Sequence, residues 1–286
     1  MYDPRSKRSF LKRMPVTELH MDELHVGSTI TLHGRQLKIR DYSDERTRQT
    51  LEATRDSFVL LTAPEAFPAL GRIVGLLEEL GLTISRMRLV NERGPVTAVE
   101  VIGGDAQAKW EEACRSLPEG HLRQVSVHEG NVYFEDLNLY PYTSVGDHCT
   151  LCIIRPHAVK SRNVGQIIQA IVDAGFEISA MRTLHLDRAQ AAEFMEVYQN
   201  VMPNFAELVD TMTAAHCLAM ELRKDGDVVE DFRRLCGPYD MDMAKHLRPN
   251  SLRAHFGVDN AQNGLHCTDL EEDAEREVRY IFEVLA

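Results

Sequence analysis

The chain has 286 residues, of which 44% are hydrophobic, and its formal net charge is −12 at pH 7. At ~150 residues for each domain, this length predicts about two domains. The acidic balance argues against a nucleic-acid-binding protein, because such proteins carry an excess of positive charge. No apolar run approaches the ~18 residues of a membrane-spanning helix, so no membrane partner is expected. The six scattered cysteines do not show the pattern of a disulfide framework, which favours an intracellular protein.

The first 45 residues are predicted to form a basic arm and a small, incomplete β domain. Their opening lacks an apolar core and is not expected to be a secretory signal. Two runs, Gly27–His33 and Gln36–Tyr42, alternate apolar and polar residues, which indicates a β-hairpin. Residues 46–56 are polar and are predicted to form a linker. The residues leave open whether the arm docks on an acidic partner or is a solvated terminus.

Residues 57–140 are predicted to form a first domain in which strands and helices alternate. Pro68 suits the first turn of a helix, where its missing N–H costs nothing, and Gly81 suits the end of the same helix. The expected strands are Ser57–Ala63, Thr83–Val90, Val96–Ile102 and Arg123–Val127, and the expected helices are Pro68–Leu80 and Asp105–Leu117.

Residues 147–286 repeat this order with additions. Apolar residues recur at helical spacing from Val164 to Val172, and Gly175 follows as a stop. The expected strands are Thr150–Ile154, Phe176–Leu184 and Cys217–Leu222, and the expected helical segments are Asn163–Ala174, Asp187–Tyr198, Asn204–Met212, Asp227–Leu235 and Glu271–Leu285. A long loop, Gly237–Asn263, is predicted before the last helix.

An internal repeat supports two copies of one plan. Gly81–Arg88 aligns with Gly175–Arg182, and the second copy carries an extra helix pair between its second and third strands. Strand–helix–strand twice over is the ferredoxin-like, split βαβ arrangement. We therefore predict an α+β fold made of two tandem ferredoxin-like domains, with an antiparallel sheet and helices on one face.

A histidine near the C-terminus is the candidate nucleophile. His266 is predicted to lie in a turn before an acidic helix, where a neutral imidazole could attack a phosphate. Asn263 precedes it, and Arg155, Arg233 and Arg253 are candidate phosphate clamps. The alternatives are ordinary: a structural histidine and solvated surface arginines.

Two aromatic residues flank the extra helix pair of the second copy. Tyr198 and Phe205 could stack on a base or ring, or they could be core aromatics. Cys149 and Cys152 look like half of a zinc site, but no second pair follows, and we predict no metal site built from protein ligands.

Two motifs in residues 148–286 resemble those of nucleoside diphosphate kinases. The run from Ile154 to Val159 reads I-R-P-H-A-V, and the run from Asn263 to Asp269 reads N-G-L-H-C-T-D. The resemblance implies a kinase in which His266 is phosphorylated by a nucleoside triphosphate such as ATP or GTP, with Mg²⁺ on the nucleotide. It further implies these roles: Glu277 orients the imidazole, Arg155, Arg233 and Arg253 bind phosphates, Asn263 contacts the sugar or phosphates, Tyr198 lies near the histidine, and Phe205 stacks on the base.

Departures from the family pattern put turnover in doubt. Arg155 stands where the family has lysine, Tyr239 where it has threonine, and Cys267 where it has glycine. An arginine does not replace a lysine conservatively at a tight phosphate site. In the first copy Thr62 takes the lysine position and the histidine motif is missing. We therefore expect weak or lost activity in the second copy and none in the first.

The tandem arrangement resembles a branch of this family that is associated with cilia and the γ-tubulin ring complex. That resemblance implies a structural protein of the doublet microtubule lumen in the cytoskeleton of the cilium or flagellum, with tubulin and other axonemal proteins as partners. The alternative is an active kinase that transfers the γ-phosphate of a nucleoside triphosphate through His266. Both functions stay open at this point.

Overall fold

The computed structural model describes residues 56–114, 122–202 and 204–286 and, nearer the N-terminus, residues 2–3, 8–9, 24, 29–32 and 35–47. In that region the predicted hairpin is confirmed: β3 (Thr29–Leu32) pairs antiparallel with β4 (Arg35–Lys38). β1 (Tyr2–Asp3) pairs with β2 (Arg8–Ser9). The predictions for the rest of the basic arm and for most of the linker lie outside the described residues.

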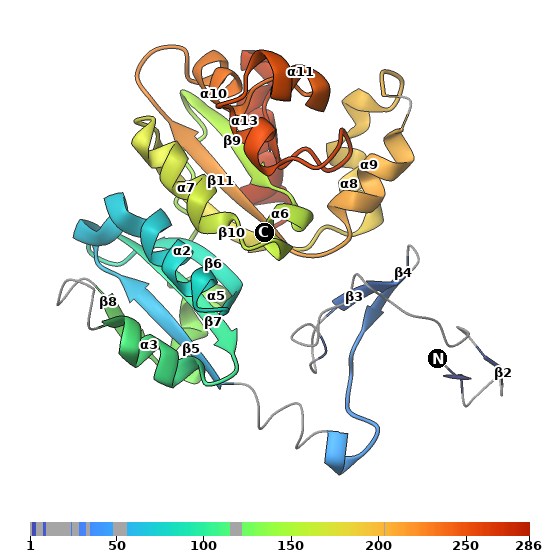
Figure 1. The fold of residues 1–286 in the computed structure, drawn as a ribbon. Coiled ribbons are helices and arrows are strands. Elements are labelled where there is room, and N and C mark those ends of the chain that lie inside the picture. Colours follow the sequence, from blue (N-terminus) through green and yellow to red (C-terminus); the bar gives the residue numbers. More distant parts are fainter. Residues whose placement is uncertain are drawn as a thin grey trace.

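One eight-stranded sheet runs through both halves of the chain (Figure 1). Its order is β12-β9-β11-β10-β6-β7-β5-β8, and all of its strand pairs are antiparallel. The strands are β5 (Asp56–Thr62), β6 (Thr83–Asn91), β7 (Pro95–Gly103), β8 (Leu122–Val125), β9 (Cys149–Ile154), β10 (Glu177–Leu184), β11 (Cys217–Arg223) and β12 (Leu265–Cys267). The predicted antiparallel sheet is confirmed, and β10 beside β6 joins its two halves.

The helices follow the predicted order, with additions. In the first half they are η2 (Pro64–Ala69), α2 (Leu70–Glu79), α3 (Ala106–Cys114), α4 (Val127–Gly130) and α5 (Val132–Glu135). In the second half they are α6 (Pro156–Lys160), α7 (Val164–Asp173), α8 (Arg188–Phe194), η3 (Glu196–Tyr198), α9 (Phe205–Met212), α10 (Val228–Cys236), α11 (Met241–Leu247), α12 (Leu252–Phe256), α13 (Glu271–Arg279) and the π-helix η4 (Tyr280–Val284). None of the described helices is long and apolar enough to cross a bilayer.

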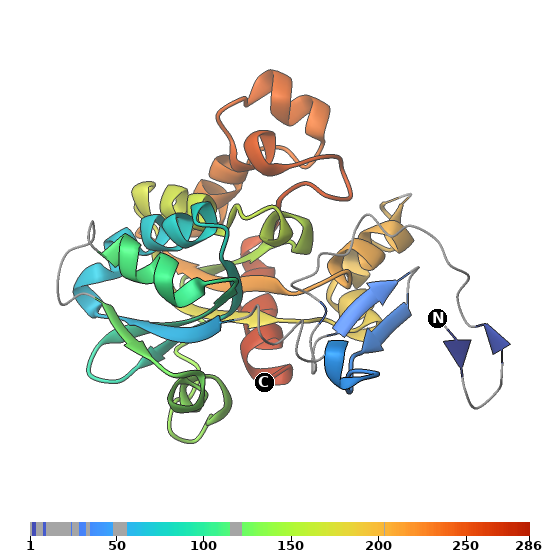
Figure 2. The ribbon, with the colours of Figure 1, turned by 60° about the horizontal axis from the view of Figure 1, so that its bottom comes forward.

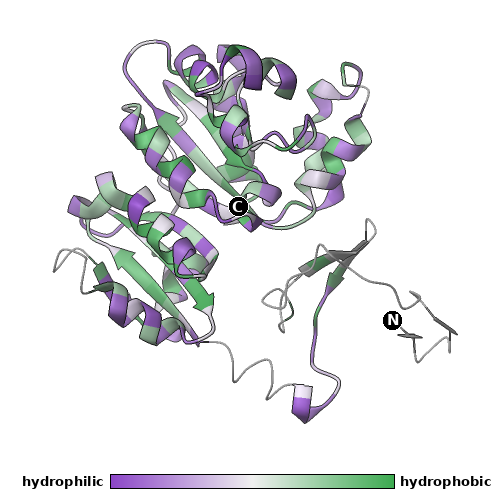
Figure 3. Cartoon of the chain, in the orientation of Figure 1, coloured by the Kyte–Doolittle hydropathy of each residue, from purple (hydrophilic) through white to green (hydrophobic). Residues whose placement is uncertain are grey.

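Helices cover both faces of the sheet, so the prediction of one covered face is wrong (Figure 2). β9 shows why, since all six of its residues are buried. Cys152 and Ile154 pack with α7 and α10, whereas Leu151 and Ile153 pack with α8, α9 and α13. A strand that is apolar at every position needs cover on both sides. Figure 3 shows hydrophobic strands beneath helices that carry one apolar side.

Three local predictions are corrected by the structure. His266 lies in the short strand β12 rather than in a turn. The predicted loop Gly237–Asn263 contains α11 and α12. The helix expected from Pro68 begins as the 3-10 helix η2 and becomes α-helical at Leu70. The first two errors matter for function, because these elements surround the candidate nucleophile.

The two halves meet at β6 and β10 and at the helices above those strands. Arg88 and Arg182 are cross-strand partners, and their guanidinium groups lie 4.5 and 4.7 Å from the ring centre of Tyr142. Above them, α2 crosses α7 so closely that a Cβ built on Gly165 would lie 2.1 Å from the backbone nitrogen of Gly75. The two segments that align in the sequence repeat therefore lie side by side in the sheet.

A buried carboxylate fastens this junction. Glu78 at the end of α2 accepts hydrogen bonds from the backbone N–H groups of Val164 and Gly165, at 3.0 and 2.9 Å. Burial raises the pKa of Glu78 from 4.5 to about 7, although the two N–H groups act against this shift. The folded chain therefore holds a proton on Glu78 more tightly than the unfolded chain does.

We expect the contribution of Glu78 to stability to depend on pH. Because its folded pKa is raised, this contribution is fully present below pH 4.5 and is lost as pH rises through about 7. Urea unfolding from pH 4.5 to 8 should show the wild type losing stability relative to Glu78→Gln, whose side chain keeps its size but does not ionise. Parallel curves for the two proteins would contradict the assignment.

Candidate active site around His266

The strand pairing sets the direction of the His266 side chain. His266 is the cross-strand partner of Ile153, and Ile153 packs with α8, α9 and α13. Because directly opposite residues of an antiparallel pair share a face, the imidazole points to the same side. The residue is 3% exposed, and the ring of Phe194 meets it edge-on at 5.0 Å.

A carboxylate on α13 orients the imidazole. His266 Nε2 lies 3.0 Å from Glu277 Oε2, and the Thr268 hydroxyl donates to the same oxygen at 2.9 Å. A carboxylate accepts hydrogen bonds, so Nε2 carries the ring proton and Nδ1 carries the lone pair. Within the described residues Nδ1 has no hydrogen-bond partner. The histidine is thus in the tautomer that a nucleophile requires.

Arg155 is a buried cation at the end of β9. It is 2% exposed, its backbone N–H donates to Gly264 O at 3.0 Å, and its Nη1 donates to Ala261 O at 2.7 Å. Burial lowers its pKa to about 10, which leaves it charged at neutral pH. No carboxylate pairs with it among the described residues, and its Nε has no partner. An uncompensated buried charge is costly unless a ligand neutralises it.

Unpaired polar atoms gather around this arginine. Nine buried side-chain nitrogen and oxygen atoms have no partner in the described part of the chain, and five of them belong to four residues around the C-terminal end of β9: Arg155, His157, Tyr239 and Asn263. A sixth, Thr150 Oγ1, lies within β9 itself. Asn263 is fully buried, and neither atom of its amide is bonded. Buried polar groups normally find partners. The concentration of such groups beside a free cation indicates a site for a polar, anionic ligand.

Asp269 brings two further predicted residues toward the site. The Tyr198 hydroxyl donates to Asp269 Oδ2 at 2.5 Å, and Arg233 Nε lies 3.9 Å from Asp269 Oδ1. The Arg233 side chain is 44% exposed, so it is accessible to a ligand. Burial and Asp269 raise the pKa of Tyr198, which keeps the hydroxyl protonated.

The side chains of two further predicted residues, Arg253 and Phe205, are held by contacts within the protein. Arg253 is buried and donates to the carbonyls of Gly237 and Leu265 and to Cys267 Sγ, at 2.8, 3.4 and 3.3 Å. Phe205 is half-buried and packs against the apolar cluster of α8, α9 and α13. Phosphate binding by Arg253 and base stacking by Phe205 stay predictions.

A cavity of about 470 Å³ adjoins the loop that carries Asn263. It is lined by residues from the start of α9, from α11 and from the connecting loop: Asn204, Glu207, Met241, Asp242, Lys245, Val258, Asp259, Asn260 and Ala261. Its size suits a small-molecule ligand. Ala261 links it to Arg155, whose guanidinium donates to the Ala261 carbonyl.

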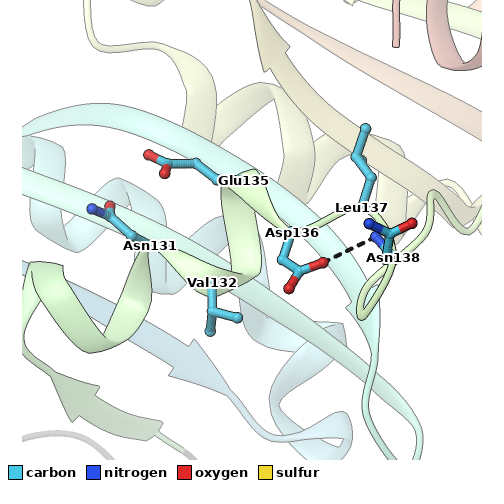
Figure 4. Close-up of a pocket in the computed structure, with 6 residues that line it drawn as sticks. All are labelled: Asn131, Val132, Glu135, Asp136, Leu137 and Asn138. Carbon is cyan, nitrogen blue, oxygen red and sulfur yellow. Dashed lines mark hydrogen bonds between the residues drawn. The ribbon is translucent and has the colours of Figure 1, made fainter.

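A second cavity, of about 610 Å³, lies beside α5 in the first half (Figure 4). Its lining comes from residues 131–138 and includes the carboxylates of Glu135 and Asp136 but no cation. Asp136 accepts a hydrogen bond from the backbone of Asn138 at 3.0 Å. This cavity offers two carboxylates and no cation, which disfavours a phosphate.

The sequence prediction missed several residues of the site. Thr268 shares Glu277 with His266, Phe194 packs on the imidazole, and His157 accepts a hydrogen bond from Gly264 N at 3.1 Å. Thr268 and His157 stood inside the two quoted motifs, so their positions were visible although their roles were not. No sequence signal marked Phe194.

Comparisons with known proteins decide the family. The sequence model described as "Nucleoside diphosphate kinase" matches residues 148–285. The protein named nucleoside diphosphate kinase homolog 7 from Rattus norvegicus is 32% identical over 339 aligned positions, which cover 100% of this chain and 86% of that protein. The chain belongs to the nucleoside diphosphate kinase family. The resemblance inferred from the two motifs is thereby confirmed.

Further relatives match the second half. Nucleoside diphosphate kinase from Aquifex aeolicus is 34% identical over 133 residues, covering 46% of this chain and 92% of that protein. A crystal structure of the same enzyme covers 48% of this chain and 96% of its own, at 33% identity and a TM-score of 0.46. The nucleoside diphosphate kinase fold of the second half is therefore confirmed by its sequence match.

Proposed function

We propose that the second half of the chain binds nucleoside diphosphates and triphosphates and that His266 Nδ1 accepts the transferred phosphoryl group. One observation carries this proposal: the Glu277 carboxylate holds the proton on Nε2 and leaves Nδ1 without a partner. A histidine that served only packing would not need a fixed tautomer beside a buried, uncompensated arginine. The family to which the chain belongs supports the same reaction class.

The proposed transfer proceeds in two half-reactions. The Nδ1 lone pair attacks the γ-phosphorus of a nucleoside triphosphate, the bond to the bridging oxygen breaks, and the nucleoside diphosphate leaves with that electron pair. A terminal oxygen of a second nucleoside diphosphate then attacks the phosphorus, and the electron pair returns to Nδ1. Throughout, Glu277 holds the Nε2 proton and offsets the positive charge that develops on the ring.

The unpaired atoms near β9 and β12 supply the contacts that phosphates need. Arg155 Nε and the Asn263 amide offer donors, and the Tyr239 hydroxyl offers another. We expect Mg²⁺ to enter on the phosphates. Among the described residues no group of three or more His, Cys, Asp or Glu side chains could hold a metal ion.

We further propose that the first half is a degenerate kinase-like domain that serves as a scaffold. Its order of β5-α2-β6-β7-α3-β8 parallels that of the second half. At the end of β5, Thr62 is buried, and its hydroxyl accepts a hydrogen bond from Thr97 N at 3.0 Å, so this position offers no cation. The axonemal role, with tubulin and other axonemal proteins as partners, stays a proposal from the resemblance, which salt extraction of isolated axonemes would test.

Phosphorylation of the purified chain tests the proposed reaction. Incubation with Mg²⁺ and radiolabelled ATP should give an acid-labile label that peptide mapping assigns to His266. Adding unlabelled GDP should then remove the label and produce labelled GTP. Absence of label at every Mg²⁺ concentration would refute phosphotransfer. A label that GDP does not remove would leave a phosphate acceptor without kinase activity and would refute the second half-reaction.

A further inference from the structure

The backbone of Gly264 departs from the regular strand pairing of β9 and β12. Arg155 N donates to Gly264 O, but the carbonyl of Arg155 already accepts from Ala158 N and Val159 N, because α6 begins there. The return hydrogen bond of an antiparallel pair is therefore unavailable. Gly264 has φ +91°, a left-handed conformation suited to glycine, and its N–H donates to His157 Nε2 at 3.1 Å instead.

The state of the His157 ring suits this contact. The ring accepts through Nε2, so its proton must be on Nδ1, and a second proton would abolish the acceptor. Burial and the nearby Arg155 charge lower the pKa of His157 to about 4, which keeps the ring neutral near pH 7. His157 is therefore a dependable acceptor under physiological conditions.

The bond fixes the segment on which the proposed chemistry depends. Gly264 lies between Asn263, whose buried amide is unpaired, and His266, two residues further along β12. Without an acceptor the Gly264 N–H would be an unpaired donor in a largely buried segment, and the segment would have reason to shift. A displacement of about 1 Å at a reacting group costs up to ~10²-fold in rate.

We propose that His157 is a positioning residue: its ring takes the place of the missing backbone acceptor for Gly264 and so sets the placement of Asn263 and His266. The residue does not touch the reacting atoms. The structural part of this inference stands by itself, and its consequence for phosphotransfer rests on the proposed function.

Two amide variants of the full chain test whether the acceptor atom at position 157 must lie where His157 Nε2 lies, or whether any polar side chain suffices. In His157→Gln the side-chain oxygen reaches the place of Nε2, whereas in His157→Asn the oxygen is too short to do so. Both are neutral and can accept a hydrogen bond. Amide hydrogen exchange at Gly264, measured by NMR, should be faster by about tenfold in His157→Asn and close to wild type in His157→Gln. Thermal unfolding of both variants checks that they fold.

Phosphorylation kinetics supply the functional readout. In His157→Asn the rate of His266 labelling at saturating ATP should fall by about tenfold or more, with a smaller change in the ATP concentration at half-maximal rate. His157→Gln should restore the rate. Equal Gly264 exchange in the two variants and the wild type would overturn the proposal, as would an equal loss of labelling rate in both. If the wild type itself takes up no label, the proposed function fails, and the exchange measurement alone decides the role of His157.

Discussion

Replacing Glu277 with alanine is expected to lower the rate of His266 phosphorylation by about 10²-fold, because the side chain that orients a reactive histidine is lost. Glu277 Oε2 is the hydrogen-bond acceptor for both His266 Nε2 and the Thr268 hydroxyl. Without it, either ring nitrogen can carry the proton, the ring can rotate, and the charge formed during attack has no counterion. Single-turnover labelling with ATP measures the effect.

Two further variants make the Glu277 result specific. Glu277→Gln keeps an oxygen that accepts from the imidazole but carries no charge, so its loss should be smaller than that of the alanine variant. Glu272→Ala removes an exposed carboxylate from the first turn of the same helix and should leave labelling unchanged. A rate for Glu277→Ala within about twofold of wild type would show that the bond to His266 is not used in catalysis.

The two sequence motifs were sufficient to predict which residues form the centre of the candidate site, because they lie on or beside two adjacent strands, β9 and β12. The first motif ends β9 and the second forms β12, so pairing of His266 with Ile153 brings Arg155, Asn263 and the proposed nucleophile into one place. Glu277 was assigned by resemblance, and the structure places it 3.0 Å from the imidazole. The strand itself was mistaken for a turn, since a strand of three residues is too short to show alternation.

The ligand contacts expected of the residues assigned only by family position stay predictions. Arg253 and Phe205 lie outside the two quoted motifs, and whether such side chains face a ligand depends on their neighbours. Cys267, which departs from the family pattern, accepts from Arg253 at 3.3 Å and helps to hold it inside the protein. The sequence position of Arg253 does not show that a neighbouring protein group binds the guanidinium in place of a ligand.

The missed helices α11 and α12 carried a local signal. They have seven and five residues, too few for hydrophobic periodicity to be visible. Each begins with a capping side chain, however: Asp240 accepts from Met243 N at 2.9 Å and Ser251 from Ala254 N at 3.4 Å. Capping residues without a periodic segment behind them were not enough to predict a helix.

The contact between the two halves could not be predicted from the sequence, although the aligned repeat segments are the ones that meet. Gly81 and Gly175 were expected to end the helices α2 and α7, and both adopt positive φ, at 74° and 80°. Their alignment said nothing about whether the two copies touch. Contact depends on Gly71 and Gly165, where an added Cβ would collide with the facing helix. A glycine within a helical segment does not show from the sequence alone which element it will face.

Replacing Gly165 with alanine is expected to be strongly destabilising for this reason. A Cβ at Gly165 would lie 2.1 Å from Gly75 N and 2.6 Å from Gly71 O, which are backbone atoms that cannot move without displacing α2. Overpacking of this kind costs about 1–3 kcal/mol and occasionally more, and we expect the upper end of that range. The shift would also disturb the bond from Gly165 N to Glu78. Urea unfolding of the full chain measures the loss.

Gly75→Ala is the matched control, because it adds the same methyl group to the same helix crossing. A Cβ there meets nothing within 4 Å, so the variant should be neutral or more stable by up to ~1 kcal/mol through its higher helix propensity. Equal stabilities for the two variants would contradict the close crossing of α2 and α7. Because the crossing of α2 and α7 packs on the opposite face of the sheet from Ile153 and His266, folded Gly165→Ala protein should still be phosphorylated on His266. Lost stability with retained labelling would show that the junction supports the fold, whereas the chemistry depends on the strands at the far end of the sheet.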